Sequence, residues 1–422
     1  MIVVCEPNCR DISHETFNLG TIYGISLAYP KERIVVFLDK THKNVLVNNA
    51  KHGKLKLDNV EWINIDTCIC MNFFNPLYNK YIIKKVINFA IKNGAMAIWF
   101  FSATQIQQRI IKNMAINNPT MCFAINMHGD IDKLAYPNFK ILSGAIPQTH
   151  RSLCQKLYYH KSEILSLCLK KSKAYLGNIF VNLLKMTYPN YDLKETLYYK
   201  SAINIRYVAL SYHIKPLIGN YLDLSRVNVR YLPLPAIYQK VQKLPINNYL
   251  KIAIFGYGHS QMLYLLNKEI EKRNITAPFE IRVIGMDGNG IHDFPWVTQP
   301  INRVLKRSEM EDLQKDIDMF MMLYERERYV LSVSGSIVEA HRYCKPIIYL
   351  DNPCFDGYNE EKSPIGIKCI DVVEMSKVIE RLANNYSEEK KEIYRYRENI
   401  IKNRNNIDIV NNLNNLRNIL TL

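Results

Sequence analysis

A short stretch around Ser334 contains residue types that could bind a phosphate. An apolar run ends at the small residues Ser334, Gly335 and Ser336, and the residues that follow have a helical pattern that includes Glu339. A helix that begins at such a turn presents unpaired backbone N–H groups beside two hydroxyls, and together these groups can bind an anion. Ser336 followed three residues later by Glu339 also matches a capping box. The pattern therefore predicts either a phosphate site or a structural helix cap.

A second small-residue loop, containing Gly256, Gly258 and His259, follows an apolar run at 250–255. Glycines after a strand allow the backbone to approach a phosphate closely. The dinucleotide-binding pattern Gly-x-Gly-x-x-Gly would need a third glycine where this chain has Gln261. The loop is therefore compatible with phosphate binding but disfavours a Rossmann dehydrogenase.

Two loops in the first half carry groups that could transfer protons. One follows the first apolar run and contains His14 and Glu15, and the other begins at His128. Histidine and carboxylate side chains are the usual general bases. The sequence His128-Gly-Asp is also typical of a simple turn, so this loop has two interpretations.

Apolar runs alternate with helical patterns along the chain, which is typical of βαβ units and parallel sheets. We expect strands at 2–5, 33–38, 60–65, 95–101, 120–127, 202–210 and 227–232 in the first half. In the second half we expect strands at 250–255, 279–284, 317–323, 346–350 and 367–370. The helical patterns between them lie at 17–28, 76–92, 106–115, 261–272 and 308–314, and from 373 onward.

A chain of 422 residues is too long for one ordinary core, so we predict two domains. In this prediction residues 1–238 form an N-terminal domain and residues 249–386 a C-terminal domain. Residues 387–422 form a helical segment that packs back on the first domain. The predicted class is α/β, with two Rossmann-like domains that face a central cleft. Ligands of such sheets bind at the carboxyl ends of the strands, where the loops described above lie.

The net charge of +16 is concentrated in one region. Residues 151–250 contain fifteen Lys or Arg against four Asp or Glu, and 153–173 has the pattern of a basic amphipathic helix. Such a helix suits an anionic membrane or a polyanionic acceptor, although a solvated helix face would have the same pattern. No zinc-finger, RNP or helix-turn-helix signature accompanies it, so nucleic acid is not an expected partner.

Other sequence features bear on the cellular compartment and on metals. The longest apolar run is far shorter than 18 residues, and the N-terminus has no basic leader, so we expect a cytoplasmic protein without a spanning helix. Ten cysteines are scattered without paired CxxC elements, which predicts neither a disulfide framework nor a zinc site. The triplets Asp130-Ile-Asp132 and Asp316-Ile-Asp318 resemble a metal motif, but such triplets are common by chance.

The second half resembles the nucleotide-sugar-binding domain of GT-B glycosyltransferases of the group 1 type. The matching parts, over roughly 130 residues, are an aspartate-bearing strand, a Ser-Gly-Ser turn, a helix with Glu-Ala and a Lys-Pro strand. Here they are Asp318 to Leu323, Ser334 to Ser336, Glu339-Ala340 and Lys345 to Ile348. The first half resembles this family in its architecture and its histidine-bearing loop.

The resemblance implies that the protein moves a sugar from a nucleotide donor to an acceptor, without a metal or other cofactor. It also implies that residues 1–238 bind the acceptor and residues 249–386 the nucleotide sugar. The donor diphosphate would bind at Ser334, Gly335 and Ser336, with Gly256, Gly258 and His259 nearby. Glu339 would bind the ribose hydroxyls. His14 or Glu15 would be the general base, and His128 would contact the donor or acceptor.

Two departures from the family pattern concern charge. Position 331 is Leu where many members have a first glutamate, and the loop after the first donor-domain strand offers only His259 and Lys268. The cation that neutralises the diphosphate is therefore unassigned. Arg303, Lys306 and Arg307 follow one another closely on a predicted loop and are candidates.

The expected partners are a nucleotide sugar, linked to UDP, GDP or CMP, and a glycan or lipid-linked acceptor of surface polysaccharide synthesis. The basic region 151–250 would contact the inner face of the membrane peripherally. Two alternatives remain open: a non-hydrolysing sugar-nucleotide epimerase, and a degenerate GT-B protein that binds glycans without catalysis. The sequence does not distinguish retention from inversion.

Overall fold

The computed structural model describes the following residues: 1–66, 75–127, 129–136, 192–238, 241, 245–257, 260–286, 294–298, 301, 303 and 305–422. His128, Gly258 and His259, together with the predicted basic helix at 153–173, lie outside these ranges.

Seven parallel strands form the first sheet, in the order β3-β2-β1-β4-β5-β6-β7. Their bounds are β1 Ile2–Glu6, β2 Ile34–Leu38, β3 Val60–Asn64, β4 Ala97–Phe100, β5 Cys122–Asn126, β6 Ile205–Ala209 and β7 Val229–Tyr231. The central strands are mostly apolar because helices cover both faces of the sheet, as is usual for parallel sheets.

Helices pack on both faces of this sheet, and a separate hydrophobic core lies on each face. Alternate residues such as Ile2, Val4 and Trp99 pack in one core, and Val3 and Phe100 pack in the other. The helices of this domain are α1 Glu15–Ala28, α2 Lys40–His52, α3 Asn75–Lys92, α4 Gln105–Ile116, η2 Gly129–Leu134, α7 Leu193–Tyr198 and α8 Ile214–Ile218.

Six parallel strands form the second sheet, in the order β10-β9-β8-β11-β12-β13. They are β8 Leu250–Tyr257, β9 Phe279–Met286, β10 Val297–Thr298, β11 Met319–Met322, β12 Ile347–Leu350 and β13 Gly366–Cys369. The accompanying helices are α9 Ser260–Ile270, α10 Arg307–Leu313, α11 Gly335–Tyr343, α12 Pro353–Asp356 and α13 Val372–Asn384. The predicted α/β class with two parallel sheets is confirmed.

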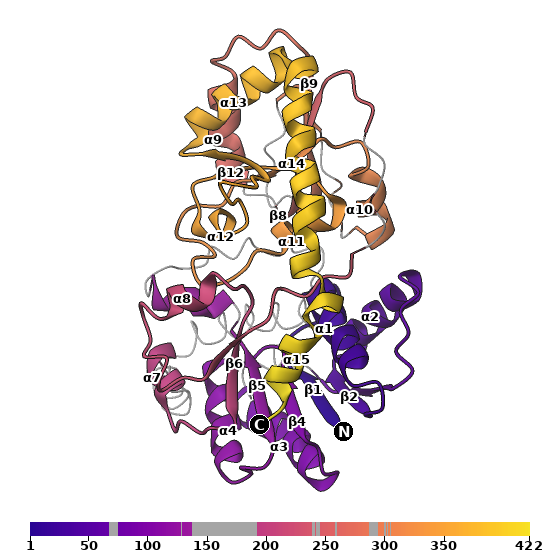
Figure 1. Cartoon of the computed structure of the whole chain (residues 1–422), viewed down its shortest axis with the longest axis vertical. Helices are drawn as coiled ribbons and strands as arrows, with labels where there is room; N and C mark the ends of the chain where they lie inside the picture. Colours follow the sequence, from indigo (N-terminus) through magenta and orange to yellow (C-terminus); the bar gives the residue numbers. More distant parts are fainter. Residues whose placement is uncertain are drawn as a thin grey trace, which may run out of the picture.

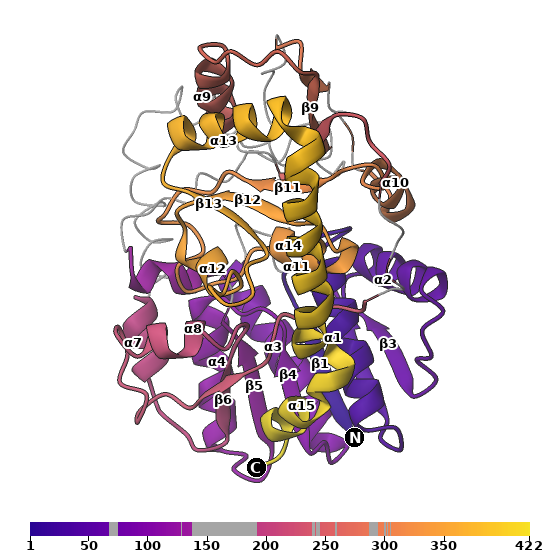
Figure 2. The same ribbon diagram turned by 45° about the horizontal axis from the view of Figure 1, so that its top comes forward.

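The C-terminal helices join the two domains. Helix α14, Tyr386–Ile407, runs from the second domain down to the first, and η4 Ile409–Asn412 and α15 Leu413–Leu420 lie against the first sheet (Figures 1 and 2). Arg206 on β6 donates to the carbonyl of Asn418 at 2.6 Å, and Ile409 and Leu416 lie so close to Gly24 that a Cβ there would clash. Both chain termini therefore lie on the first domain (Figure 1).

An aromatic contact forms a second connection between the domains. The ring of Tyr358 lies 5.1 Å from the ring of His213, in the loop after β6, and 5.5 Å from the ring of His341 on α11. Tyr212 donates a hydrogen bond of 3.0 Å to the carbonyl of Gly357. Burial lowers the pKa of His213 and of His341 to about 4.

We expect acid to destabilise the protein partly through His341. Its imidazole is neutral in the folded state, whereas the unfolded state takes up a proton near pH 6.5, so stability is lost as the pH falls from about 6.5 towards 4. This group accounts for a loss of roughly 2 kcal/mol between pH 8 and pH 5. Urea unfolding across this range should therefore give a flatter pH profile for His341→Gln than for the wild type. Parallel profiles would contradict the assignment.

Candidate active site between the two sheets

The two sheets face each other through the carboxyl ends of their strands. In each sheet the strand order reverses beside the first strand, between β1 and β4 and between β8 and β11. Ligands of open α/β sheets bind at such switch points. Two contacts bring these edges together: Thr16 at the start of α1 bonds Glu339 of α11, and Asp132 of η2 bonds Leu331 and Ser332.

The Ser334 turn begins helix α11. Ser334 is the N-cap, in an extended conformation, and its hydroxyl accepts from the backbone N–H of Ser336 at 3.2 Å. The predicted capping box between Ser336 and Glu339 is wrong, because the helix begins at Gly335 and Ser336 already lies in its first turn. Gly335 is exposed, and a Cβ there would meet no atom within 4 Å. The N-terminus of α11 is therefore open to a ligand.

The loop after β8 lies directly beside this turn. Ser336 Oγ donates to the carbonyl of Phe255 at 3.0 Å and bonds the hydroxyl of Tyr324 at 2.9 Å. Gly256 has a φ of +94°, and a Cβ on it would lie 3.6 Å from Ser336 Oγ. The structure thus brings together Gly256 and Ser336, which the sequence analysis assigned to one donor site.

Glu339 lies one turn into α11 and is only 7% exposed. Its Oε1 accepts from Arg307 at 2.7 Å and from Thr16 at 3.4 Å, whereas its Oε2 has no hydrogen-bond partner among the described residues. Burial raises the pKa of Glu339 above its ordinary value, and the Arg307 guanidinium opposes this rise. Glu339 and the exposed Gly335 are four residues apart and therefore share one helix face.

The three basic candidates differ in their surroundings. Arg303 is half-exposed and pairs with Glu309, and Lys306 is an exposed residue at the N-cap of α10. Arg307 is the first residue of α10, and its side chain is 11% exposed. It also donates to Thr16 of the first domain at 3.1 Å. Arg307 is thus the candidate that contacts the predicted ribose-binding carboxylate.

His14 occupies the N-cap of α1 with a left-handed backbone, at φ +55°. Part of this residue is exposed, although the surrounding protein crowds its imidazole, and it lies two residues before Thr16, which bonds Glu339 across the cleft. The pKa of His14 is lowered because the surrounding protein restricts hydration of its charged form, while the Glu6 carboxylate opposes this effect. The neighbouring Glu15 accepts from Asn49 at 2.6 Å.

Glu6 is a buried carboxylate that the sequence analysis did not select. It ends β1, where Oε1 accepts from the backbone N–H of Asn8 at 2.9 Å and of Cys9 at 3.1 Å, and from the hydroxyl of Ser102. Its Oε2 has no partner among the described residues. A charged residue at the end of the apolar sequence Ile2-Val-Val-Cys-Glu is the signal that could have identified it.

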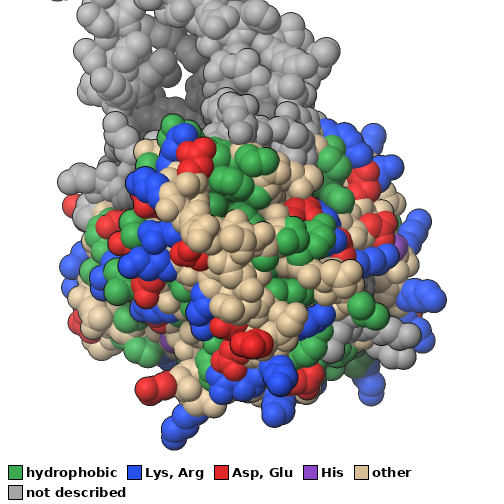
Figure 3. Space-filling view, turned by 90° about the horizontal axis from the view of Figure 1, so that it is seen from above, with side chains coloured by type: hydrophobic (Ala, Val, Ile, Leu, Met, Phe, Trp, Pro, Cys, Tyr) green, Lys and Arg blue, Asp and Glu red, His purple; other side chains and the backbone are tan. Residues whose placement is uncertain are grey.

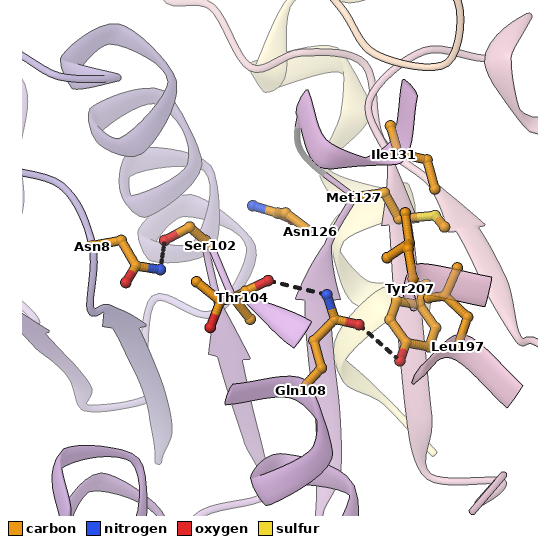
Figure 4. Close-up of a pocket in the computed structure, with 11 residues that line it drawn as sticks. Asn8, Ser102, Thr104, Gln108, Asn126, Met127, Ile131, Leu197 and Tyr207 are labelled. Atoms are coloured by element: carbon orange, nitrogen blue, oxygen red, sulfur yellow. Dashed lines mark hydrogen bonds between the residues drawn. The ribbon is translucent and has the colours of Figure 1, made fainter. Parts of the chain in front are cut away.

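A cavity of about 220 Å³ lies in the first domain beside this carboxylate. Asn8, Ser102 and Asn126 form its polar side, at the carboxyl ends of β1, β4 and β5, and Ile131 and Tyr207 lie opposite (Figure 4). The remaining lining residues are Ala103, Thr104, Gln108, Met127, Leu193 and Leu197. The amide of Asn8 donates to Ser102 at 2.9 Å, so the cavity wall continues the Glu6 network.

Asp132, Asp316 and Asp318 of the two triplets have structural contacts. Asp132 accepts from the backbone N–H of Leu331 at 2.7 Å, and Asp316 pairs with Lys251 and Arg282. Asp318 accepts from Tyr386 at 3.0 Å. Within the ranges that the structure describes, no group of three or more His, Cys, Asp or Glu residues is arranged to hold a metal ion.

Surface charge and helix hydropathy bear on the expected membrane contact. Seen from above, the end of the molecule formed by the second domain carries positive and negative side chains intermixed with apolar ones (Figure 3). None of the helices in the described ranges combines the length and the apolar character that crossing a membrane requires. The basic helix predicted at 153–173 lies outside these ranges.

Comparisons with known proteins identify the fold. No protein-family model and no curated protein sequence matches the chain. The apo lipopolysaccharide outer core galactosyltransferase WaaB matches 99% of this chain and 98% of its own, with a TM-score of 0.55 and 11% identity. HepE of Anabaena, in complex with UDP-glucose, matches over 99% and 97%, with a TM-score of 0.57 and 12% identity.

A glycosyltransferase from Rickettsia africae is similar over 99% of this chain and 96% of its own, with a TM-score of 0.53 and 13% identity. At these identities the likeness establishes the architecture. The chain has the GT-B fold, with two Rossmann-like domains on either side of a cleft.

Gly285→Ala should destabilise the second domain. Gly285 has a φ of +145°, and a Cβ there would lie 1.9 Å from the carbonyl oxygen of Gly256. The backbone must shift, so we expect the free energy of unfolding to fall by about 2 kcal/mol or more. Gly335→Ala is the matched control, because that site has open space and should change stability by less than about 1 kcal/mol. Equal unfolding midpoints in guanidinium for the two variants would contradict this account.

Proposed function

We propose that the protein is a glycosyltransferase that moves a sugar from a nucleotide-sugar donor to a glycan or lipid-linked acceptor. The observation that carries the proposal is the position of Glu339. One oxygen of this carboxylate has no hydrogen-bond partner among the described residues. Glu339 also lies one turn from the open N-terminus of α11 and faces helix α1, which begins after His14, of the other domain. Helix α11 thus combines a phosphate-binding site with a hydrogen-bond acceptor for hydroxyl groups.

The donor diphosphate binds at Ser334, Gly335 and Ser336 in this proposal. The N–H groups at the start of α11 and the positive end of the helix dipole stabilise negative charge there. Gly256 lets the backbone after β8 approach the same phosphates. Because these groups neutralise the leaving diphosphate, we infer a transfer that needs no metal ion or other cofactor.

Glu339 binds the ribose hydroxyls, for which a carboxylate is a double acceptor. In the transfer, the bond between the sugar C1 and the phosphate oxygen breaks, and its electron pair leaves with the diphosphate. A new bond forms between C1 and the acceptor oxygen, whose proton passes to a base. We assign that base to His14, which precedes α1 close to Thr16 at the cleft and whose lowered pKa keeps the imidazole neutral.

We also propose that the acceptor belongs to a surface polysaccharide and that the protein works at the cytoplasmic face of a membrane. Support comes from the fifteen basic residues of 151–250, which suit anionic lipid or an anionic acceptor. Two similar folds belong to a lipopolysaccharide galactosyltransferase and to a protein that binds UDP-glucose, so UDP-sugars are the first donors to test.

The donor assignment is tested with UDP-glucose, UDP-galactose, GDP-mannose and a CMP-sugar. We expect one of them to raise the melting temperature of the wild type and to be turned over. Glu339→Gln should weaken its binding by roughly 10- to 100-fold, because a charged acceptor of two hydroxyls becomes a neutral one. Glu61→Gln, at an exposed pair with Arg33, is the control and should bind like the wild type.

Three outcomes would contradict the donor assignment. A wild type that binds and converts none of these sugars would overturn the proposed transferase. Product formed from the nucleotide sugar alone, without any acceptor, would indicate an epimerase. Glycan binding with no turnover would indicate a non-catalytic protein.

The role of His14 predicts a specific pH profile. Because its pKa is lowered, the neutral base persists below the ordinary value of about 6.5, and kcat should stay constant down to that pH. His14→Asn should lower kcat by roughly 100-fold or more while donor affinity is retained. Asn is the appropriate replacement because it tolerates the left-handed backbone at this position. A variant with unchanged kcat would show that another group is the base.

A further inference from the structure

Arg307 and Glu339 form an ion pair at the boundary of the two domains. Arg307 Nη2 lies 2.7 Å from Glu339 Oε1 and 3.1 Å from the hydroxyl of Thr16, and both charged side chains are nearly buried. A buried carboxylate is costly unless a counter-charge accompanies it. Arg307 therefore supplies a counter-charge that favours the ionised form of Glu339 at the domain boundary.

The same carboxylate is the one that would bind the donor ribose. Its Oε1 is occupied by Arg307 and Thr16, while its Oε2 is buried without a partner among the described residues. A ribose hydroxyl pair would use both oxygens, so a bound nucleotide competes with Arg307 for Glu339. The Arg307 guanidinium then needs another anion to balance its charge.

The donor itself brings that anion. Its diphosphate would lie at the N-terminus of α11, and Gly335 is four residues, or about 6 Å along the helix, from Glu339. A planar guanidinium with five donors is well suited to pair with phosphate oxygens. Other nearby basic residues are already paired at the surface, Arg303 with Glu309 and Lys268 with Glu271.

A second arginine can keep Glu339 paired after the exchange. Arg342 lies three residues further along α11, with Nη1 3.8 Å from Glu339 Oε1. Its Nε is buried and has no partner in the described part of the chain. The carboxylate therefore does not lose all compensation when Arg307 moves away.

We propose that Arg307 recognises the donor by exchanging one anion for another. It holds Glu339 in the empty cleft and transfers to the phosphates of a nucleotide when the ribose takes its place on Glu339. This inference rests on the proposed function and assigns the cation that the sequence left open. Because Arg307 also bonds Thr16, the exchange releases one contact between the domains at the moment when the donor binds.

The test compares nucleotides with the corresponding nucleosides. Binding of UDP, GDP and CMP, and of uridine, guanosine and cytidine, is measured by calorimetry for the wild type, Arg307→Ala and Arg307→Lys. We expect Arg307→Ala to weaken the preferred nucleotide by roughly 10- to 100-fold, since it loses charge-assisted bonds to phosphate. The matching nucleoside should bind as well as before or more tightly, because Glu339 is released. The nucleotide affinity of Arg307→Lys should lie between those of the wild type and Arg307→Ala, since lysine keeps the positive charge but lacks the planar guanidinium.

Arg33→Ala is the matched control, because Arg33 precedes β2 at the amino edge of the first sheet and pairs with exposed Glu61. It should bind both ligands like the wild type. Equal losses for nucleotide and nucleoside in Arg307→Ala would indicate a structural role and overturn this inference alone, as would an unchanged nucleotide affinity. A wild type that binds none of the three nucleotides would overturn the proposed function and the inference together.

Discussion

The site depends on one electrostatic constraint, the burial of the Glu339 carboxylate between two domains. A carboxylate in this position needs a counter-charge, and the chain supplies Arg307 from α10 and Arg342 from α11 itself. The cost of leaving it unpaired explains why α10, α11 and the start of α1 converge at one point. It also explains why Thr16, a neutral residue of the other domain, participates: it adds a donor without adding charge.

When a site is divided between two domains, the relative positions of its residues depend on the contacts that hold the domains together. Asp132 fixes the segment before the Ser334 turn to the first domain, Tyr358 packs on His213, and η4 and α15 lie against the first sheet. These connections lie at different places around the cleft. They restrict the rotation of the second sheet relative to the first. The two domains are therefore held in register when Thr16 bonds Glu339.

The sequence predicted most strands because both sheets are covered on two faces, which makes the central strands short apolar runs, but it missed the two-residue edge strand β10. It missed α2, Lys40–His52, because that helix buries only His42, Leu46 and Ala50 and is otherwise polar. It placed the Ser334 turn correctly but misassigned its cap, since one residue in the helix start decides which hydroxyl bonds the backbone. The sequence could not predict that Arg307 pairs with Glu339, because the two residues are 32 positions apart and local patterns do not encode such pairs.

The two sides of the cleft differ in how firmly their polar groups are fixed. In the first domain, Asn8 bonds both Ser102 and Gln107, and Gln107 bonds Asn79, so the groups beside Glu6 hold one another in place. In the second domain, Glu339 pairs with Arg307 and has Arg342 as a second ionic neighbour. In the proposed reaction the first domain orients an attacking hydroxyl, and a rigid network suits that task because small displacements there are costly for the rate. The second domain binds a charged donor and releases a more charged product in the same proposal, and the proposed exchange of Arg307 between anions suits that task.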